Sequence, residues 1–158
     1  MPDRLRTELV ALLRGGNAHV PTADALRGVP PGLINEAPDG CPHSLWDLLE
    51  HLRIAQRDIL DFTRGDGYEK KDWPADYWPD APGTAADWDE ALAAFFADLD
   101  ALIDLAEDES VDLVAELPHA PGYTALRELL LAADHNSHHV GQMVLLRRLL
   151  GCWPPVEG

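Results

Sequence analysis

The stretch TALRELLLAADHNSHHVGQMVLLRRLL, residues 124–150, decides the fold class of this chain. Apolar residues recur in it at intervals of three and four positions, which is typical of an amphipathic α-helix. Gly151 follows the last apolar residue, and prolines stand just beyond it, as is common after a helix end. Arg147 and Arg148 suit the negative end of the helix dipole. The stretch therefore predicts one long helix.

Three of the seven histidines in the chain lie close together in this predicted helix: His135, His138 and His139. Since a helix advances about 100° per residue, His135 and His139 lie only about 40° apart, whereas His138 points about 60° away from His135. The sector of His135 and His139 also holds Leu131, Gln142, Met143, Leu146 and Leu149, and is expected to face the core. His138 is expected at the rim of the helix.

The i, i+4 spacing of His135 and His139 allows two imidazoles to bind one metal ion. Two buried imidazoles that share no partner are costly to desolvate, and Zn²⁺, Ni²⁺ or Fe²⁺ would remove that cost. Histidine pairs with this spacing also occur on helix surfaces by chance, so the spacing alone leaves both interpretations open.

Three more amphipathic helices are predicted, over about residues 2–14, 44–62 and 84–106. The second begins with the capping signal Ser44-Leu45-Trp46-Asp47, and the third begins near Thr84 or Asp87. Long irregular segments connect the helices, and no segment reads convincingly as a strand. We therefore predict an all-α chain, a four-helix bundle with long connecting loops, as one domain over residues 1–158.

A metal site needs at least a third ligand, and His51 is the best candidate. It lies midway along the second predicted helix, at the edge of an apolar face, where it can meet the fourth helix; a boundary histidine without a ligand role is the alternative. His19, His43 and His119 lie in loops or at helix entries and are weaker candidates. Asp47 and Asp58 could orient a ligand, although a helix cap and a solvated carboxylate are the plainer roles for them. Gln142 is a candidate orienting group.

The segment DWPADYWP, residues 72–79, concentrates Trp73, Tyr77 and Trp78 in an irregular stretch. These aromatic side chains could wall a pocket over the metal, or they could only fill a hydrophobic gap at the end of the bundle.

Charge and composition narrow the function classes. The net charge of −16 disfavours binding to a nucleic-acid backbone, and no basic stripe relieves it. No apolar run approaches the length of a membrane helix, and the N-terminus reads as an amphipathic helix rather than a signal peptide, so we expect a cytoplasmic protein. Cys41 and Cys152 form no metal-binding motif and are expected to be reduced thiols.

Three segments together resemble the DinB-like (damage-inducible) superfamily of metal-binding four-helix bundles: PHSLWDLLEHL, DWPADYWP and DHNSHHVGQMVLLRRLLGCWP. Their most specific parts are the W-x4-H of the second helix and the H-x3-H-x-G-Q of the fourth. The resemblance implies a metal triad of His51, His135 and His139, with His138 outside it at a position where the family often carries an aromatic residue. A second apolar sector, Leu126, Leu130, Ala133, Val140 and Val144, is either buried within the chain or a homodimer surface, which the resemblance favours.

Some members of that superfamily resemble transferases or isomerases that use a low-molecular-weight thiol. The resemblance thus implies a metal-dependent enzyme, either a thiol-dependent transferase or a hydrolase, that activates a thiol or water for a small-molecule substrate. A non-catalytic, metal-binding stress-response protein is the alternative, and a helical protein without metal is the third. No general base can be identified from the sequence.

Overall fold

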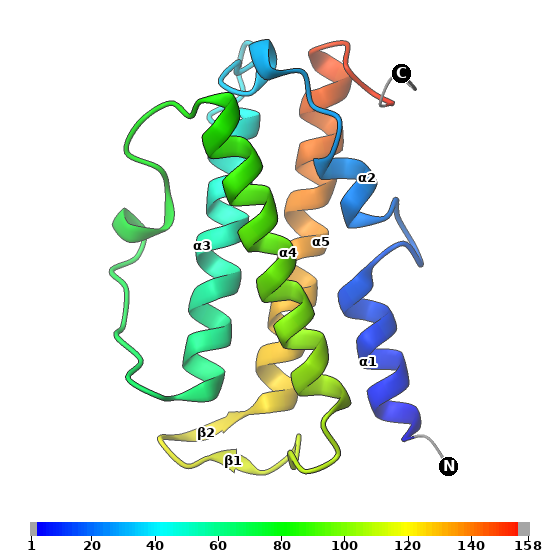
Figure 1. Cartoon of the computed structure of the whole chain (residues 1–158), viewed down its shortest axis with the longest axis vertical. Helices are drawn as coiled ribbons and strands as arrows, with labels where there is room; N and C mark the ends of the chain where they lie inside the picture. The colour runs from blue at the N-terminus through cyan, green and yellow to red at the C-terminus, as the bar shows by residue number, and fades with distance from the viewer. Residues whose placement is uncertain (1–2, 155–158) are drawn as a thin grey trace.

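The structure is a computed structural model that describes residues 3–154 of the 158-residue chain. Helix dominates the described residues, as predicted (Figure 1). The five α-helices are α1 (Arg4–Arg14), α2 (Thr22–Leu26), α3 (Leu45–Arg64), α4 (Ala85–Glu107) and α5 (Ala125–Leu149). Two single 3-10 turns lie in the connections, η1 (Pro31–Leu33) and η2 (Ala75–Tyr77). Pro2, where the first helix was predicted to begin, lies outside the described residues.

The predicted helix starts are confirmed by their caps. Ser44 and Asp47 form a reciprocal capping box at the start of α3, and Thr84 and Asp87 form one at the start of α4. Each box satisfies backbone N–H groups that have no partner inside the helix. Helix α3 extends past the predicted end at about residue 62 and closes at Gly65, whose φ of 77° is left-handed.

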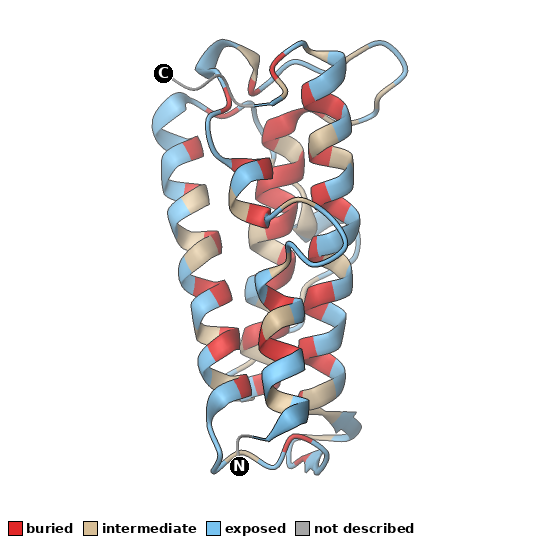
Figure 2. Cartoon of the chain, turned by 90° about the vertical axis from the view of Figure 1, so that its right-hand side faces the viewer, coloured by how far each residue is buried: buried red, intermediate tan, exposed pale blue. Residues whose placement is uncertain are grey.

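The four longest helices run side by side along the long axis of the molecule, and the short α2 lies against α5 (Figure 1). Helix α3 packs against both α4 and α5, while α1 packs against α4 and α5 from the other side. The residues buried between these helices are largely leucine, with Phe95, Trp46, Trp88 and Met143 among them (Figure 2). This arrangement brings the middle of α3 next to the middle of α5.

The prediction that the chain has no strand is wrong. Strands β1 (Glu116–Leu117) and β2 (Ala120–Thr124) form a small antiparallel hairpin before α5. The hairpin is too short for a readable alternation of apolar residues. A tertiary contact holds it: His119 Nε2 lies 2.7 Å from the carbonyl oxygen of Phe62 in the last turn of α3. A sequence pattern cannot reveal such a contact.

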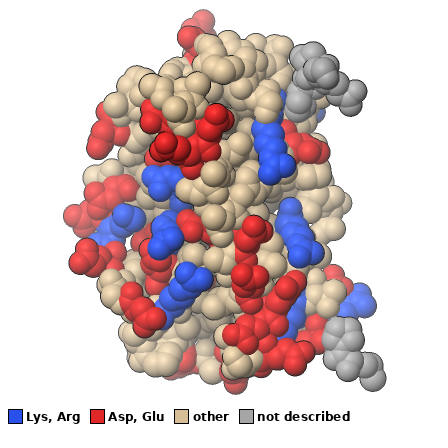
Figure 3. Space-filling view, in the orientation of Figure 1, with Lys and Arg blue, Asp and Glu red and all other residues tan. Residues whose placement is uncertain are grey.

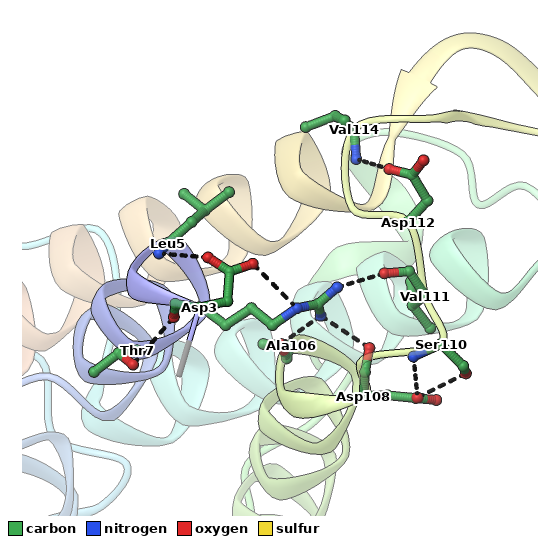
Figure 4. Close-up of polar contacts among 10 residues, drawn as sticks. Asp3, Leu5, Thr7, Ala106, Asp108, Ser110, Val111, Asp112 and Val114 are labelled. Carbon is green, nitrogen blue, oxygen red and sulfur yellow. Dashed lines mark hydrogen bonds and ion pairs between the residues drawn. The ribbon is translucent and has the colours of Figure 1, made fainter. Parts of the chain in front are cut away.

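Two arginines anchor helices by binding backbone carbonyl groups. The Arg6 guanidinium donates to the carbonyl oxygens of Ala106, Asp108 and Val111, and so ties α1 to the chain that leaves α4 (Figure 4). Arg147 lies in the last turn of α5, near the negative end of the helix dipole, and it is fully buried, at 0% exposed. It donates to carbonyl oxygens of residues 24, 25, 27, 28 and 152, and therefore joins α5 to α2 and to the chain after α5.

The two apolar sectors of α5 are only partly buried. On the histidine side, Met143 and Leu146 are buried, but Leu131 and Leu149 are 39% and 57% exposed, so the predicted core face is narrower than expected. On the opposite side, Ala133 and Val140 are buried within the chain, whereas Leu130 is exposed. Because α5 has neighbours on more than one side, neither sector is wholly a surface or wholly core.

Acidic side chains gather in groups on the face shown in Figure 3, with basic side chains interspersed among them, and the acidic residues outnumber the basic ones in the chain. Within residues 3–154, no helix combines the length and the apolar character that crossing a membrane requires.

Candidate metal centre

His51 from α3 and His135 and His139 from α5 converge between these two helices. One nitrogen from each of the three imidazoles lies within 4.8 Å of the others, so the group could hold a metal ion. The side chains of His51 and His139 are buried, at 2% and 9% exposed, and His135 is half-buried. The helices that carry them pack against each other, and both contribute leucines to the core.

The spacing of the nitrogens suits a metal ion. The Nε2 atoms of His51 and His135 lie 3.1 Å apart. Two imidazole nitrogens that bind one Zn²⁺ at about 2.0–2.1 Å, with a tetrahedral angle between them, are about 3.3–3.4 Å apart. The donor set, three imidazoles, suits several divalent transition metals. The residues present therefore fit a divalent metal ion.

Two of the imidazoles have their Nδ1 atom held by a hydrogen bond. His51 Nδ1 lies 2.9 Å from the carbonyl oxygen of Tyr77, and His139 Nδ1 lies 2.6 Å from Oε1 of Gln142. Both partners are oxygen acceptors, so each Nδ1 carries the hydrogen and each Nε2 presents its lone pair. Such contacts orient metal-binding histidines and set their tautomer. Gln142, the candidate orienting group, thus contacts the Nδ1 atom of His139.

All three imidazoles are held in the neutral form that metal binding requires. Burial lowers the pKa of His135 to about 3, helped by the neighbouring imidazoles of His139 and His51. Burial likewise lowers the pKa of His139 to about 4, against the effect of its bond to Gln142. Burial also lowers the pKa of His51, against its bond to the Tyr77 carbonyl. At neutral pH no proton needs to be displaced before a metal can bind.

Asp47 and Asp58, the two acidic residues considered as groups that orient a ligand, have different roles. The Asp47 carboxylate accepts from the backbone N–H of Ser44 at 2.8 Å, which is the capping role, and within residues 3–154 it has no hydrogen bond to a histidine. The Asp58 carboxylate accepts from the Tyr77 hydroxyl at 2.6 Å. Burial and this bond raise the pKa of Tyr77, which keeps the phenol protonated. Asp58 therefore supports His51 indirectly, by fixing the residue whose carbonyl oxygen holds the His51 ring.

The aromatic loop lies against the site. The Trp78 ring stacks on the His51 ring, with centroids 4.2 Å apart and planes inclined by 8°. The Trp73 centroid is 6.3 Å from that of His51 and 5.2 Å from that of Tyr77, and the Trp73 side chain is 70% exposed. Trp78 contacts His51 through its ring, whereas Tyr77 contacts it through the backbone carbonyl group.

His43 is a neighbour of the site that sequence reasoning set aside as a loop residue. Its ring stacks on the other face of Trp78, with centroids 3.9 Å apart, so that Trp78 lies between His43 and His51. The only signal for it in the sequence is its place just before the capping box of α3. His138 lies on the exposed side of α5, with its ring edge-on to His139 at 4.8 Å, which agrees with its predicted rim position.

The other two histidines lie elsewhere. His19 contacts the carbonyl oxygen of Val20, and His119 serves the hairpin at the end of α3.

A family model described as the DinB superfamily matches residues 20–143, a span that includes all three converging histidines and the aromatic loop. No protein with a curated description matches the chain.

Proposed function

The chain belongs to the DinB superfamily, and on that premise we propose that His51, His135 and His139 bind one divalent metal ion, as the ligands of a metal-dependent enzyme. The convergence of the three ligand nitrogens within 4.8 Å, from helices far apart in the sequence, is the observation that carries this proposal. The lowered pKa values of the three imidazoles and the orienting bonds to Tyr77 and Gln142 support it. Zn, Ni and Fe are the metals that the donor set suits.

The reaction class that we propose is activation of a thiol or of water toward a small-molecule substrate. A divalent ion at this site would act as a Lewis acid that lowers the pKa of a bound thiol or water molecule and polarises an electrophile. Three protein ligands leave at least one coordination position for a ligand, as in catalytic zinc sites. Trp73, Tyr77 and Trp78 are proposed as the pocket wall, because their loop covers the His51 side of the site.

We also propose that residues 1–158 form one domain, a four-helix bundle of the DinB-like type, in a cytoplasmic protein that binds no nucleic acid. The exposed leucines of α5, which include Leu130, Leu145 and Leu149, support a homodimer in which a second copy covers them. The side-by-side packing of α1, α3, α4 and α5 supports the bundle.

Metal analysis tests the proposal most directly. Protein purified without a nickel column should carry about one divalent ion per chain, and His51→Ala or His139→Ala should lose it. His19→Ala is the matched control, because His19 is an exposed histidine whose imidazole bonds a loop carbonyl oxygen. Wild-type protein that takes up no Zn²⁺, Ni²⁺ or Fe²⁺, and whose stability is the same with and without these ions, would refute the metal site.

Turnover tests the catalytic half. Mixtures of simple thiols and electrophiles, and ester or amide substrates without a thiol, should show turnover that chelation abolishes and His139→Ala prevents. Metal binding without turnover in either screen would favour the alternative function, a non-catalytic metal-binding protein of the stress response.

A further inference from the structure

The three histidines differ in how their Nδ1 atoms are satisfied. Those of His51 and His139 bond to Tyr77 and Gln142. His135 Nδ1 is buried and has no hydrogen-bond partner among the described residues. A buried nitrogen without a partner is costly, so a neighbouring group that could accept its hydrogen would stabilise His135.

The adjacent residue carries such a group. Asn136 is 4% exposed, and its Oδ1 atom is likewise buried without a hydrogen-bond partner among residues 3–154. Its side chain also acts on His135, because it works against the lowering of the His135 pKa by burial. A buried nitrogen and a buried oxygen on neighbouring residues therefore both await a partner.

Asn136 belongs to a chain of amides that spans three helices. Its Nδ2 donates to Oε1 of Gln56 on α3 at 2.7 Å, and Nε2 of Gln56 donates to the carbonyl oxygen of Phe95 on α4 at 2.7 Å. Gln56 is 0% exposed, so solvent water does not compete for these bonds.

The backbone carbonyl at one end sets the direction of every bond in this chain. The Phe95 carbonyl group can only accept, so Gln56 must turn its NH₂ group toward it and its oxygen toward Asn136. Asn136 must then turn its own NH₂ group toward Gln56, which leaves its Oδ1 as an acceptor. The chain of amides thus ends, on the residue that follows His135 in the sequence, in an oxygen that needs a donor.

His135 can carry its hydrogen on either nitrogen. His51 Nε2 carries a lone pair, because the hydrogen of His51 is on Nδ1 and is donated to the Tyr77 carbonyl oxygen. With its hydrogen on Nε2, His135 would donate to His51 across 3.1 Å and would place a lone pair at the buried Nδ1, so that neither Nδ1 nor Asn136 Oδ1 could donate to the other. With its hydrogen on Nδ1, it would serve Asn136 and free Nε2 for a metal.

We infer that Gln56 and Asn136 are positioning residues that favour the tautomer of His135 with its hydrogen on Nδ1, which is the form that can bind a metal through Nε2. This inference rests on the proposed metal site. The two amides would then hold the Nδ1 hydrogen of His135. Gln142 does this for His139, and the Tyr77 carbonyl group does it for His51.

The tautomer of His135 can be measured by ¹⁵N NMR on chelator-treated protein at pH 7. Asn136→Leu removes the acceptor oxygen, so the fraction of His135 with its hydrogen on Nδ1 should fall. Asn136→Asp keeps an acceptor and adds charge, so the same fraction should equal or exceed that of the wild type. An unchanged fraction in Asn136→Leu overturns the inference; should that variant not fold, a smaller fraction in Asn136→Asp overturns it.

Zinc titration gives the second readout. Asn136→Leu should weaken Zn²⁺ binding by about 10- to 100-fold, the usual effect of losing a group that orients a ligand, while Asn136→Asp should not weaken it. Thr63→Val is the matched control: it removes a buried side-chain bond on α3, from Oγ1 to the Ile59 carbonyl oxygen at 2.6 Å, and should leave Zn²⁺ affinity unchanged. Equal loss of affinity in Asn136→Leu and Thr63→Val overturns the inference. Wild-type protein that binds no Zn²⁺ refutes the proposed function instead, and the tautomer comparison still decides the role of the amides.

Discussion

Replacement of Arg147 by methionine should destabilise the protein strongly. The guanidinium is fully buried and donates six hydrogen bonds of 2.8–3.3 Å to the carbonyl oxygens of residues 24, 25, 27, 28 and 152. Met has a similar length but no donor, so five carbonyl oxygens lose a charged partner. Because a buried polar group left without a partner costs about 1–3 kcal/mol, and the segments around α2 and after α5 can partly relax toward water, we expect about 3–5 kcal/mol.

The assay is urea unfolding followed by circular dichroism. Arg147→Met should lower the free energy of unfolding by that amount, and Arg147→Lys by about half as much, since an ammonium group has only three donors. Arg148→Met is the matched control, because Arg148 is the next residue of the same helix but is exposed, and a change within about 0.5 kcal/mol is expected. A loss below about 1 kcal/mol in Arg147→Met, or an equal loss in both methionine variants, would show that the six contacts do not stabilise the fold.

Three further predictions concern the candidate metal centre and the end of α3. Gln142→Leu removes the acceptor that holds His139 Nδ1, so Zn²⁺ affinity in a competition titration should fall about 10- to 100-fold. Gln142→Glu keeps an acceptor and should bind Zn²⁺ as tightly as the wild type. Equal affinities for the wild type, Gln142→Leu and Gln142→Glu would contradict this prediction. In the absence of metal, the free energy of unfolding should decrease as the pH falls from about 6.5 toward 4. The reason is that the imidazoles of the unfolded chain have a pKa near 6.5, whereas in the folded protein the pKa is about 3 for His135 and about 4 for His139, so that the unfolded state takes up protons first. Urea midpoints at pH 7 and pH 5 measure this, and a His135→Gln/His139→Gln variant with the same decrease would refute it. Gly65→Ala should lower the melting temperature by several degrees, since φ is 77° there and the added methyl group meets the His119 ring, whereas Gly67→Ala, with φ of 70° and open space, should cost less.

Much of the helical structure could be predicted from the sequence. The capping signal at Ser44, the predicted start near Thr84 or Asp87 and the glycine after the last helix depend on local sequence, and the structure confirms these helix boundaries. The wheel of α5 also placed His138 apart from His135 and His139, as observed. The choice of His51 as a partner depended more on the family resemblance than on spacing, because its distance along the chain carries no geometric information.

Other parts of the site could not be predicted from the sequence. Tyr77 was expected as an aromatic wall, yet it holds His51 through its carbonyl oxygen, a group that every residue possesses. The acceptor at Asn136 follows from a bond to the Phe95 carbonyl group at the far end of the amide chain. Asp58 reaches His51 only through Tyr77. Such contacts depend on which backbone groups happen to face a side chain after folding.

The sequence by itself determined where the helices begin, which residues share a face of α5, and that two imidazoles lie one turn apart. These follow from the pitch of the α-helix and the chemistry of its ends, which act over a few residues. Only the tertiary structure decided that His51 meets that pair, that the described part of the chain includes a hairpin before α5, and that Arg147 is buried. The reason is physical: each depends on how helices distant in the sequence pack, and burial then determines which polar groups must find one another.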